Sequence, residues 1–204
     1  MGHQALLIPR LILISDRSRI EGERFFELVD AALAGGVDAV LAREKDMTSA
    51  KLLSFCARLR ALTNKHQAKL IVHSQADVAK AVGADGVHVA AAAINEIPLI
   101  RQWLGNANML LSASCHNEEE LAAASKNEAD FALLSPVFPT KSHPGAAHLG
   151  AVRFQKVAKH APIPVIGLGG ISVKNRGEIA DFGAAVIGAI LDAGDPKAAA
   201  RRLL

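Results

Sequence analysis

The sequence predicts an α/β fold in which eight parallel strands, each followed by a helix, close into a (β/α)8 TIM barrel. Short apolar runs alternate with amphipathic helical segments along the whole chain of 204 residues. Most of these runs are continuously hydrophobic, as strands are when both faces of a parallel sheet are covered. Eight such units follow one another without a linker or a low-complexity tract, so residues 1–204 are predicted to form one barrel domain.

Each unit can be assigned in order from its apolar pattern and its turn residues. The predicted strands cover residues 11–16, 39–43, 70–73, 86–89, 109–114, 131–135, 164–168 and 185–190. The predicted helices cover residues 23–33, 49–66, 76–82, 96–104, 118–124, 151–160, 173–181 and 196–203. An open, doubly wound sheet is the alternative, and it is disfavoured because no dinucleotide-binding fingerprint follows the first strand.

The composition narrows the class of partner. Half of the residues are hydrophobic and 21% are charged, a balance that allows a large core. The net charge of +3 comes from basic residues spread along the chain, and Tyr is absent, so no nucleic-acid partner is expected. No apolar run is long enough for a membrane span, and the run between Arg10 and Asp16 is too short for a secretory signal. We therefore expect a cytoplasmic protein that acts on small phosphorylated substrates, with no membrane partner.

The stretch 164–172 predicts a phosphate site. A short apolar strand ends in Gly169 and Gly170, where the backbone can take positive φ and present its N–H groups to a ligand. The predicted helix 173–181 would add free N–H donors and a partial positive charge at its N-terminus. Gly188, placed in the predicted eighth strand, joins this site because phosphate often binds after strands seven and eight of such a barrel. The alternative is a tight turn that binds no ligand.

Two cations follow the second strand. Arg43 and Lys45 are two residues apart, so both side chains should project to one side, into the barrel mouth. Placing two positive charges together in the barrel mouth costs free energy unless an anion binds between them. A diphosphate or a second phosphate would be such an anion. The alternative is that Glu44 or Asp46 pairs with them at the surface.

Further candidate side chains end the third and fifth strands. Ser112, Ser114 and His116 should share one face, with Ser114 as a hydrogen-bond donor to a phosphate. Cys115 should point the other way, so a Cys–His nucleophile pair is not expected, and His116 could instead begin the next helix. His73 ends the third strand as a candidate hydrogen-bonding group, base or metal ligand. No HxH or HxxxH cluster accompanies it, so no metal site is predicted.

A loop of more than ten residues follows the sixth strand. Loops of this length in a compact domain are usually functional lids or disordered segments. The prolines of this loop limit its freedom, which favours an ordered lid carrying Thr140, Lys141 and His143. A solvated loop without a function is the alternative.

With these positions in hand, the chain resembles the thiamine phosphate synthase/TenI superfamily over nearly its whole length. The resemblance is carried by six motifs in order: residues 41–46, 84–88, 114–116 with Glu119, 135–140, 163–171 and the last strand. The amino-acid sequences of residues 113–116 and 142–145 are most similar to those of the branch that is often fused behind a Nudix hydrolase.

The resemblance implies an enzyme of thiamine biosynthesis. Thiamine phosphate synthases join hydroxymethylpyrimidine diphosphate to a thiazole phosphate. The diphosphate leaves with the help of Mg²⁺, and the thiazole nitrogen captures the pyrimidine cation. The residues that the resemblance assigns to the substrates are Arg43, Lys45 and Ser114 for the diphosphate, Thr140 in the lid, and Gly169 and Gly188 for the thiazole phosphate. A homodimer is implied as well.

The chain departs from the family pattern at the metal positions. The Asn-Asp-Arg motif after the third strand is His73-Ser74-Gln75 here, and the Gly-Gln-x-Asp motif after the fourth is replaced by four alanines at 90–93. Both aspartates that bind Mg²⁺ in the synthases are therefore absent, and Mg²⁺ would come only through the substrate diphosphate. TenI-type proteins, which tautomerise a thiazole carboxylate phosphate or have no clear activity, show similar losses. The TenI histidine of strand six, however, corresponds to Pro136 here.

Three hypotheses therefore stay open. The first is a thiamine-pathway enzyme that resembles the synthases. The second is a TenI-like thiazole tautomerase, with His73, His116 or His143 as its base, or a non-catalytic thiazole-phosphate-binding protein on the same barrel. The third is another phosphate-substrate barrel enzyme, such as a sugar-phosphate isomerase, which would need Asp16 and Glu44 as its acid–base pair.

Overall fold

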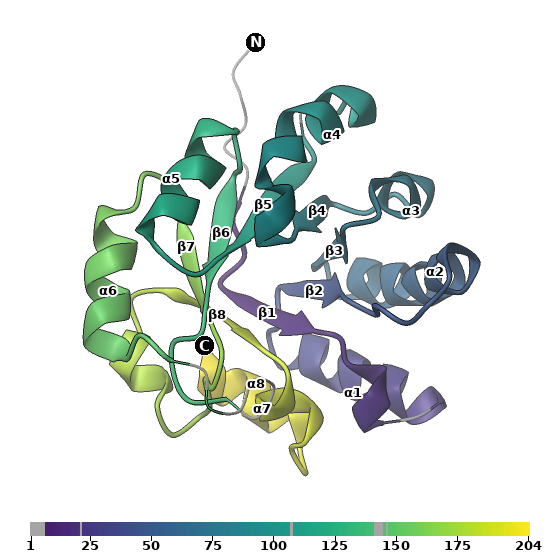
Figure 1. The fold of residues 1–204 in the computed structure, drawn as a ribbon. Coiled ribbons are helices and arrows are strands. Elements are labelled where there is room, and N and C mark those ends of the chain that lie inside the picture. Colours follow the sequence, from purple (N-terminus) through teal and green to yellow (C-terminus); the bar gives the residue numbers. More distant parts are fainter. Residues whose placement is uncertain (1–6, 21, 107, 141–144, 146) are drawn as a thin grey trace.

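A computed structural model describes residues 7–20, 22–106, 108–140, 145 and 147–204. The eight strands form a closed barrel in the order of the sequence, with β8 pairing back to β1. Every neighbouring pair of strands is parallel. Helices surround the barrel (Figure 1), and the predicted (β/α)8 TIM barrel is confirmed.

Most elements follow the predicted order; the exceptions are the helix predicted at 173–181, which is absent, and α7, which was not predicted. The strands are β1 (Leu11–Ile14), β2 (Ala39–Ala42), β3 (Lys69–His73), β4 (Gly86–Val89), β5 (Leu110–Cys115), β6 (Phe131–Leu134), β7 (Val165–Leu168) and β8 (Gly183–Val186). The helices are α1 (Glu23–Ala34), α2 (Ser49–Lys65), α3 (Ala76–Ala81), α4 (Ile97–Leu104), α5 (Glu118–Lys126), α6 (Ala151–His160), α7 (Gly188–Leu191) and α8 (Pro196–Leu203). Short 3-10 helices lie in the connections: η1 (Arg17–Arg19), η2 (Ala91–Glu96) and η3 (Arg176–Ile179).

Side-chain caps set the start of several helices. Thr48, Asn117 and Asp195 each accept a hydrogen bond from a backbone N–H in the first turn of α2, α5 and α8. Such a cap stabilises a helix by about 1 kcal/mol. The predicted helix starts at residues 49, 118 and 196 agree with the structure because each directly follows a capping residue.

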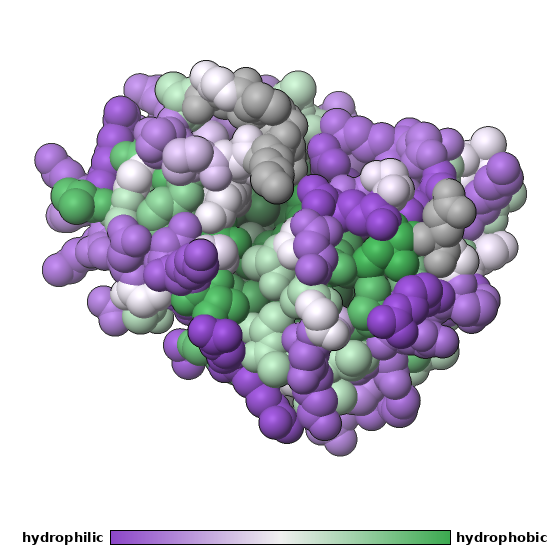
Figure 2. Space-filling view, turned by 90° about the horizontal axis from the view of Figure 1, so that it is seen from below, coloured by the Kyte–Doolittle hydropathy of each residue, from purple (hydrophilic) through white to green (hydrophobic). Residues whose placement is uncertain are grey.

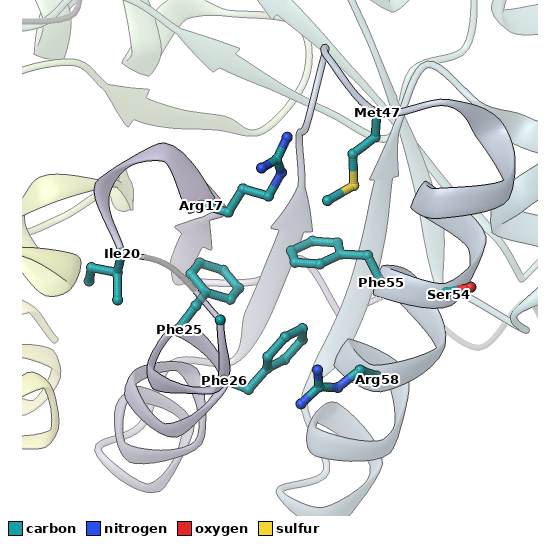
Figure 3. A pocket seen from close by; sticks show the side chains of 9 residues that line it. Arg17, Ile20, Phe25, Phe26, Met47, Ser54, Phe55 and Arg58 are labelled. Carbon is teal, nitrogen blue, oxygen red and sulfur yellow. The ribbon is translucent and has the colours of Figure 1, made fainter.

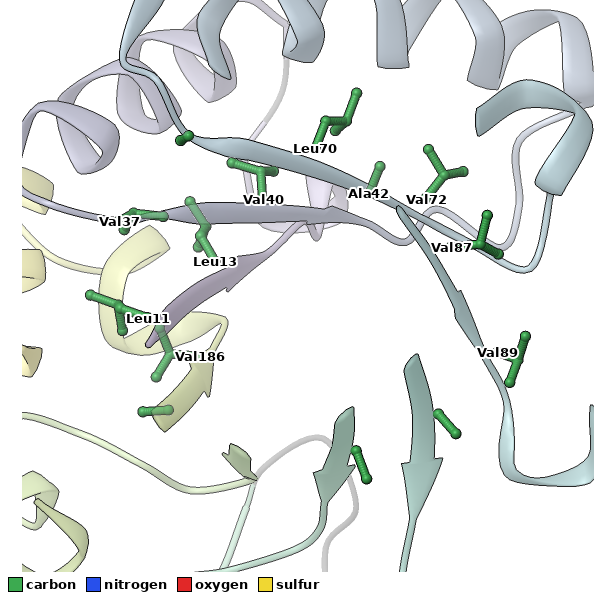
Figure 4. Close-up of a cluster of buried hydrophobic side chains, with 14 of the residues drawn as sticks. Leu11, Leu13, Val37, Val40, Ala42, Leu70, Val72, Val87, Val89 and Val186 are labelled. Atoms are coloured by element: carbon green, nitrogen blue, oxygen red, sulfur yellow. The ribbon is translucent and has the colours of Figure 1, made fainter. Parts of the chain in front are cut away.

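Side chains alternate between the two faces of the barrel wall. Ile12, Ile14 and Leu41 belong to a cluster inside the barrel, whereas Leu11 and Leu13 belong to the larger cluster between the strands and the helices (Figure 4). Burying one such side chain contributes about 1.5–3 kcal/mol, so a one-residue slip of register would be opposed along every strand. The same alternation decides which side chains face the barrel mouth.

The predicted helix 173–181 is wrong. The connection after β7 contains only the 3-10 turn η3. The side-chain oxygen of Asn175 accepts hydrogen bonds from the backbone N–H (2.7 Å) and the hydroxyl (3.2 Å) of Ser172, and its amide donates to the carbonyl oxygen of Gly170 (3.0 Å). These bonds hold a local turn that competes with a first helical turn. Arg176 is buried and donates to three backbone carbonyl oxygens, which further ties the segment to its surroundings.

The predicted eighth strand, 185–190, is placed too late. β8 begins at Gly183, because Ala184 already donates its N–H to the carbonyl oxygen of Arg10 (2.8 Å). The last residue of β8 that pairs with β1 is Val186, opposite Leu13, and the strand ends there. Gly188 is therefore not in a strand but is the first residue of α7.

The outer surface is mainly hydrophilic. Figure 2 shows hydrophilic side chains over most of the face seen from below, with hydrophobic side chains gathered across its middle. On α4, Leu99 and Trp103 are exposed. In the part of the chain that the structure describes, no helix combines the length and the hydropathy that a membrane span needs.

Candidate functional site

The inward face of β2 to β5 carries the polar side chains of the barrel mouth. Arg43, His73, Ser112 and Ser114 each lie two or four residues after a member of the inner apolar cluster, so the alternation turns them inward. His88 lies beside His73 and Ser112 in the strand register. The alternation therefore brings side chains from four neighbouring strands to one place.

Arg43 and Lys45 form no ion pair with another described residue. The acids between and after them bind Arg17 instead, which approaches Glu44 (3.7 Å) and Asp46 from the loop after β1. Glu44 is buried, and burial raises the pKa of its carboxyl group. The alternative in which Glu44 or Asp46 neutralises the two cations is therefore wrong, and both cations are open to an anionic ligand.

His73 is held in the neutral form. Its Nδ1 atom is buried and has no hydrogen-bond partner among the described residues. Burial, and then the charges of Arg43 and Lys45, lower the pKa of His73 to about 4. A neutral imidazole with an unpartnered nitrogen can exchange a hydrogen bond or a proton with a ligand.

His88 was not among the predicted site residues. It is 2% exposed, and its ring bridges two hydroxyl groups, Ser112 Oγ at 2.9 Å from Nδ1 and Ser114 Oγ at 2.8 Å from Nε2. Burial, and then His73 and Arg43, lower the pKa of His88 to about 3. The sequence held a signal for it, because a histidine between Val87 and Val89 in an apolar strand takes the inward position.

The end of β5 is arranged as predicted for three of its four residues. Ser112 and Ser114 share the inward face, and Cys115 points to the other side, where burial raises the pKa of its thiol to about 12. Cys115 and His116 therefore form no nucleophile pair. His116 does not join the site: its ring is exposed and binds Glu120 Oε2 at 2.9 Å.

The opposite half of the mouth is made of backbone. Gly169 and Gly170 follow β7 with φ of 96° and 66°. A Cβ on Gly169 would lie 2.8 Å from Pro136 Cβ, and one on Gly170 would lie 2.7 Å from the carbonyl oxygen of Phe138. Their N–H groups donate to no acceptor among the described residues. The two glycines therefore serve the close approach of the β6–α6 loop and also leave two donors free.

Gly188 lies next to this glycine pair, because β8 is the neighbour of β7. As the first residue of α7, it has an N–H without an intrahelical partner. Arg19 covers this helix start and bridges Asp16 (2.8 Å) and Asp192 (2.8 Å). Arg19 was not predicted from the sequence, because its contact to Asp192 joins residues 173 positions apart.

The predicted lid begins beside the same glycines. The N–H groups of Val137 and Phe138 donate to the carbonyl oxygens of Leu168 (2.9 Å) and Gly169 (3.0 Å), so the loop starts anchored to β7. Thr140 follows and is partly buried. Lys141 and His143 lie outside the described residues.

The described residues do not fit a resident Mg²⁺ ion. They include no group of three or more His, Cys, Asp or Glu side chains placed to hold a metal. Ser74 and Ala93 stand at the positions where the resemblance would require aspartates. Arg43 and Lys45 further oppose a bare cation at this mouth.

A cavity lies between α1 and α2 (Figure 3), and none of the candidate site residues lines it. It measures about 290 Å³, and most of its wall is apolar, with Phe25, Phe26, Met47 and Phe55. The two arginines at its rim are already paired with carboxylates: Arg17 with Glu44 and Asp46, and Arg58 with Glu23. The unpaired cations Arg43 and Lys45 are not among the residues that line this cavity.

The chain matches known proteins over most of its length. The model of a family described as thiamine monophosphate synthase (TMP-TENI) matches residues 11–192. A putative thiamine-phosphate synthase of Geobacter sulfurreducens is 38% identical over 198 residues, which cover 95% of this chain and 92% of the relative. A thiamine-phosphate synthase of Chloroflexus aurantiacus is 35% identical over 200 residues, with 95% and 90% covered.

A solved structure agrees with these relatives. The thiamine phosphate pyrophosphorylase from Pyrococcus furiosus superposes with a TM-score of 0.82 at 32% identity, over 95% of this chain and 93% of that one. The fold, the family model and the relatives lead to one assignment. The chain belongs to the thiamine monophosphate synthase (TMP-TENI) family.

Proposed function

We propose that the protein is a thiamine phosphate synthase-like transferase of thiamine biosynthesis, which joins hydroxymethylpyrimidine diphosphate to a thiazole phosphate. The observation that carries the proposal is the pair of cations, Arg43 and Lys45, which face the mouth without a carboxylate partner among the described residues. A site for a thiazole phosphate alone would not need them. Membership of the family supports the same class of substrates.

The two halves of the mouth suit two anionic groups. The diphosphate would lie against Arg43, Lys45 and the hydroxyl of Ser114, and the thiazole phosphate against the N–H groups of Gly169, Gly170 and Gly188. In the reaction, the bond between the pyrimidine methylene carbon and the diphosphate oxygen breaks, and the electron pair leaves with the diphosphate. The thiazole nitrogen then donates its lone pair to the methylene carbon.

The protein's part in this reaction is electrostatic. Arg43 and Lys45 stabilise the negative charge that grows on the leaving diphosphate. The inner wall below them is apolar, with Leu41 and Ile71 each 1% exposed, and it keeps water away from the pyrimidine cation. No residue is assigned to Mg²⁺, which would arrive only with the diphosphate.

A TenI-like tautomerase, or a non-catalytic thiazole-phosphate-binding protein, is the second candidate. It is favoured by the absence of an acidic cluster among the described residues and by the neutral ring of His73, whose free nitrogen could move a proton. The sugar-phosphate isomerase is disfavoured, because Asp16 binds Arg19 and Glu44 binds Arg17. His73 is therefore the candidate base of the tautomerase, whereas the transferase as proposed uses no base.

Calorimetric titration separates these candidates. The wild-type protein is titrated with thiazole phosphate and then with hydroxymethylpyrimidine diphosphate, each with and without Mg²⁺, and thiamine phosphate formation is followed with both substrates present. Binding of both ligands together with product supports the transferase. Binding of thiazole phosphate alone, indifferent to Mg²⁺, supports the second candidate. Binding of neither ligand would exclude the thiamine assignment.

The proposal also covers the cellular location, the oligomeric state and the partners of the protein. By analogy with the family, we expect a cytoplasmic homodimer that acts on small phosphorylated substrates, with neither nucleic acid nor membrane as a partner. We also place it in the branch related to the Nudix-fused proteins. Sedimentation at several protein concentrations tests the dimer directly.

A further inference from the structure

The side chain of His88 is buried, and both of its ring nitrogens form hydrogen bonds. Nδ1 lies 2.9 Å from Ser112 Oγ, and Nε2 lies 2.8 Å from Ser114 Oγ. His88 and Ser112 are 2% and 1% exposed, whereas Ser114 is only partly buried. A buried ring thus connects a hydroxyl in the barrel interior to a hydroxyl in the mouth.

The neutral ring carries one N–H hydrogen, and the nitrogen that holds it decides which of the two serine hydroxyls must donate to the ring. Burial lowers the pKa of His88 to about 3, so the imidazole is neutral, with one nitrogen as donor and the other as acceptor. If Nδ1 held the hydrogen, the hydroxyl hydrogen of Ser112 would have no acceptor, because Ser112 Oγ has no hydrogen-bond partner other than His88 among the described residues. An unpaired buried donor would disfavour this tautomer by roughly 10- to 100-fold.

The Nε2–H tautomer gives a hydrogen-bond partner to each buried polar group of Ser112 and His88. The Ser112 hydroxyl donates to Nδ1, and Nε2–H donates to Ser114 Oγ. The hydroxyl hydrogen of Ser114 is then the one donor of this network left over, and Ser114 is only partly buried, near the C-terminal end of β5, rather than in the interior. A ligand or water can accept it there at no cost to the core.

We propose that Ser112 fixes His88 as the Nε2–H tautomer, so that the chain of hydrogen bonds from Ser112 through His88 forces the Ser114 hydroxyl to act as a donor toward an anion in the mouth. Ser112 and His88 are then positioning residues, and Ser114 is the group that touches the ligand. The role of the ligand rests on the proposed function, whereas the tautomer is a property of the ligand-free protein. The class of ligand is a phosphate or diphosphate group, which accepts hydrogen bonds but cannot donate them when fully ionised.

The tautomer can be measured directly. In protein labelled with ¹⁵N at histidine, the ¹⁵N shifts distinguish the protonated ring nitrogen from the bare one, and the His88 signals are those lost in His88→Asn. The expected result is a neutral ring protonated at Nε2. A ring protonated at Nδ1 would overturn the proposal, because Ser114 would then donate to His88 and not to a ligand.

Two serine substitutions test the connection to the mouth. Affinity for inorganic diphosphate is measured by calorimetry for Ser114→Ala, Ser112→Ala and the double variant, with Ser54→Ala on the exposed face of α2 as the matched control. We expect Ser114→Ala to lose about 10-fold in affinity and Ser112→Ala about 2-fold, the loss that an even mixture of tautomers gives, while the double variant loses no more than Ser114→Ala, since both residues act through one hydrogen bond. In Ser112→Ala, the His88 signals should shift toward a mixture of tautomers, which a mere loss of packing would not cause.

The outcomes distinguish this inference from the proposed function. An Nε2–H ring in a protein that binds neither diphosphate nor thiazole phosphate would leave the hydrogen-bond chain intact and overturn the proposed function alone. Full diphosphate affinity in Ser112→Ala, with unchanged His88 signals, would overturn the inference while leaving the proposed function in place. Should Ser112→Ala unfold, Ser112→Cys, which keeps a weak donor, is expected to retain the tautomer in a folded protein.

Discussion

The two halves of the barrel mouth present hydrogen-bond donors by different means. The half formed by β2 to β5 uses side chains, above all Arg43, Lys45 and Ser114. The half formed by β7 and β8 uses backbone N–H groups, at Gly169 and Gly188 among others. The difference implies that the proposed ligand contacts are separable from folding on one side and inseparable from it on the other.

Packing explains this difference. Arg43 and Lys45 have no ion-pair partner among the described residues, so removing one of them breaks no ion pair there. The backbone of Gly169 and Gly170, by contrast, touches the loop that holds Phe138. A substitution there changes the fold before it changes a ligand contact.

The largest effect is expected from Gly170→Ala. Its Cβ would overlap the carbonyl oxygen of Pro139, and its φ of 66° is strained for any side chain, so we expect a loss of about 2–4 kcal/mol in the free energy of unfolding. Urea unfolding measures it. Gly177→Ala is the matched control, because a Cβ there meets open space and its φ is not in the left-handed region. Equal midpoints for the two variants would contradict the packing account.

A smaller effect, and on binding alone, is expected from Arg43→Gln. Losing a charged donor to an anion should lower diphosphate affinity by about 10- to 100-fold, while the free energy of unfolding stays within about 0.5 kcal/mol of wild type. Calorimetry and urea unfolding provide the two numbers. Lys51→Gln, an exposed charge change on α2, should alter neither. A large stability loss in Arg43→Gln would show that the two properties are not separable on this side.

The pH dependence of stability sharpens the description of the side-chain half. The pKa of His73 is lowered to about 4 in the folded protein, below its ordinary value of 6.5, so the unfolded chain binds more protons between these pH values. The free energy of unfolding is therefore not reduced by this histidine above pH 6.5, and it falls as the pH is lowered from 6.5 toward 4. His73→Asn should reduce the slope of unfolding free energy against pH in this window, by at most about 1.4 kcal/mol per pH unit.

Urea unfolding at several pH values between 7 and 4 checks this expectation. The exposed His160→Asn is the control, and its slope should match that of wild type. An unchanged slope in His73→Asn would mean that His73 is not held neutral by its surroundings.

Among the glycines of the proposed phosphate site, a smaller loss of stability than that of Gly170→Ala is expected from Gly188→Ala. Its Cβ would meet Asp192 Oδ2 at 2.6 Å, but this atom is the end of a flexible side chain that can move aside. We expect a loss below about 1 kcal/mol in urea unfolding, because φ at this position is not in the left-handed region. A loss as large as that of Gly170→Ala would place Gly188 in the same packing class as the glycine pair.

The alternation of strand residues made much of the site predictable. Arg43, His73, Ser112 and Ser114 were predicted from their positions at strand ends, and the structure turns all four inward. The same count applied to β4 would have identified His88. It was missed because a histidine inside a hydrophobic run looks like part of the core until its two serine partners are placed beside it.

Local patterns were insufficient where long-range contacts compete with them. The segment 173–181 has helical spacing, yet the bonds of Asn175 and the buried Arg176 make it a turn. The apolar run at 185–190 resembles a strand, but its second half forms α7. The first segment is tied by Arg176 to the carbonyl oxygen of Leu203, and the second ends its strand where β8 stops pairing with β1. No local pattern contains either contact.

The sequence by itself determined the order of the strands, the barrel class and the inward side chains, because periodicity of two and 3.6 residues is a local property of the chain. Only the tertiary structure decided that Arg17 rather than Arg43 takes Glu44, and that Gly170 is required by Pro139. It also decided that His88 joins two serines. These are contacts between separate strands and loops, and their partners are chosen by how the barrel closes.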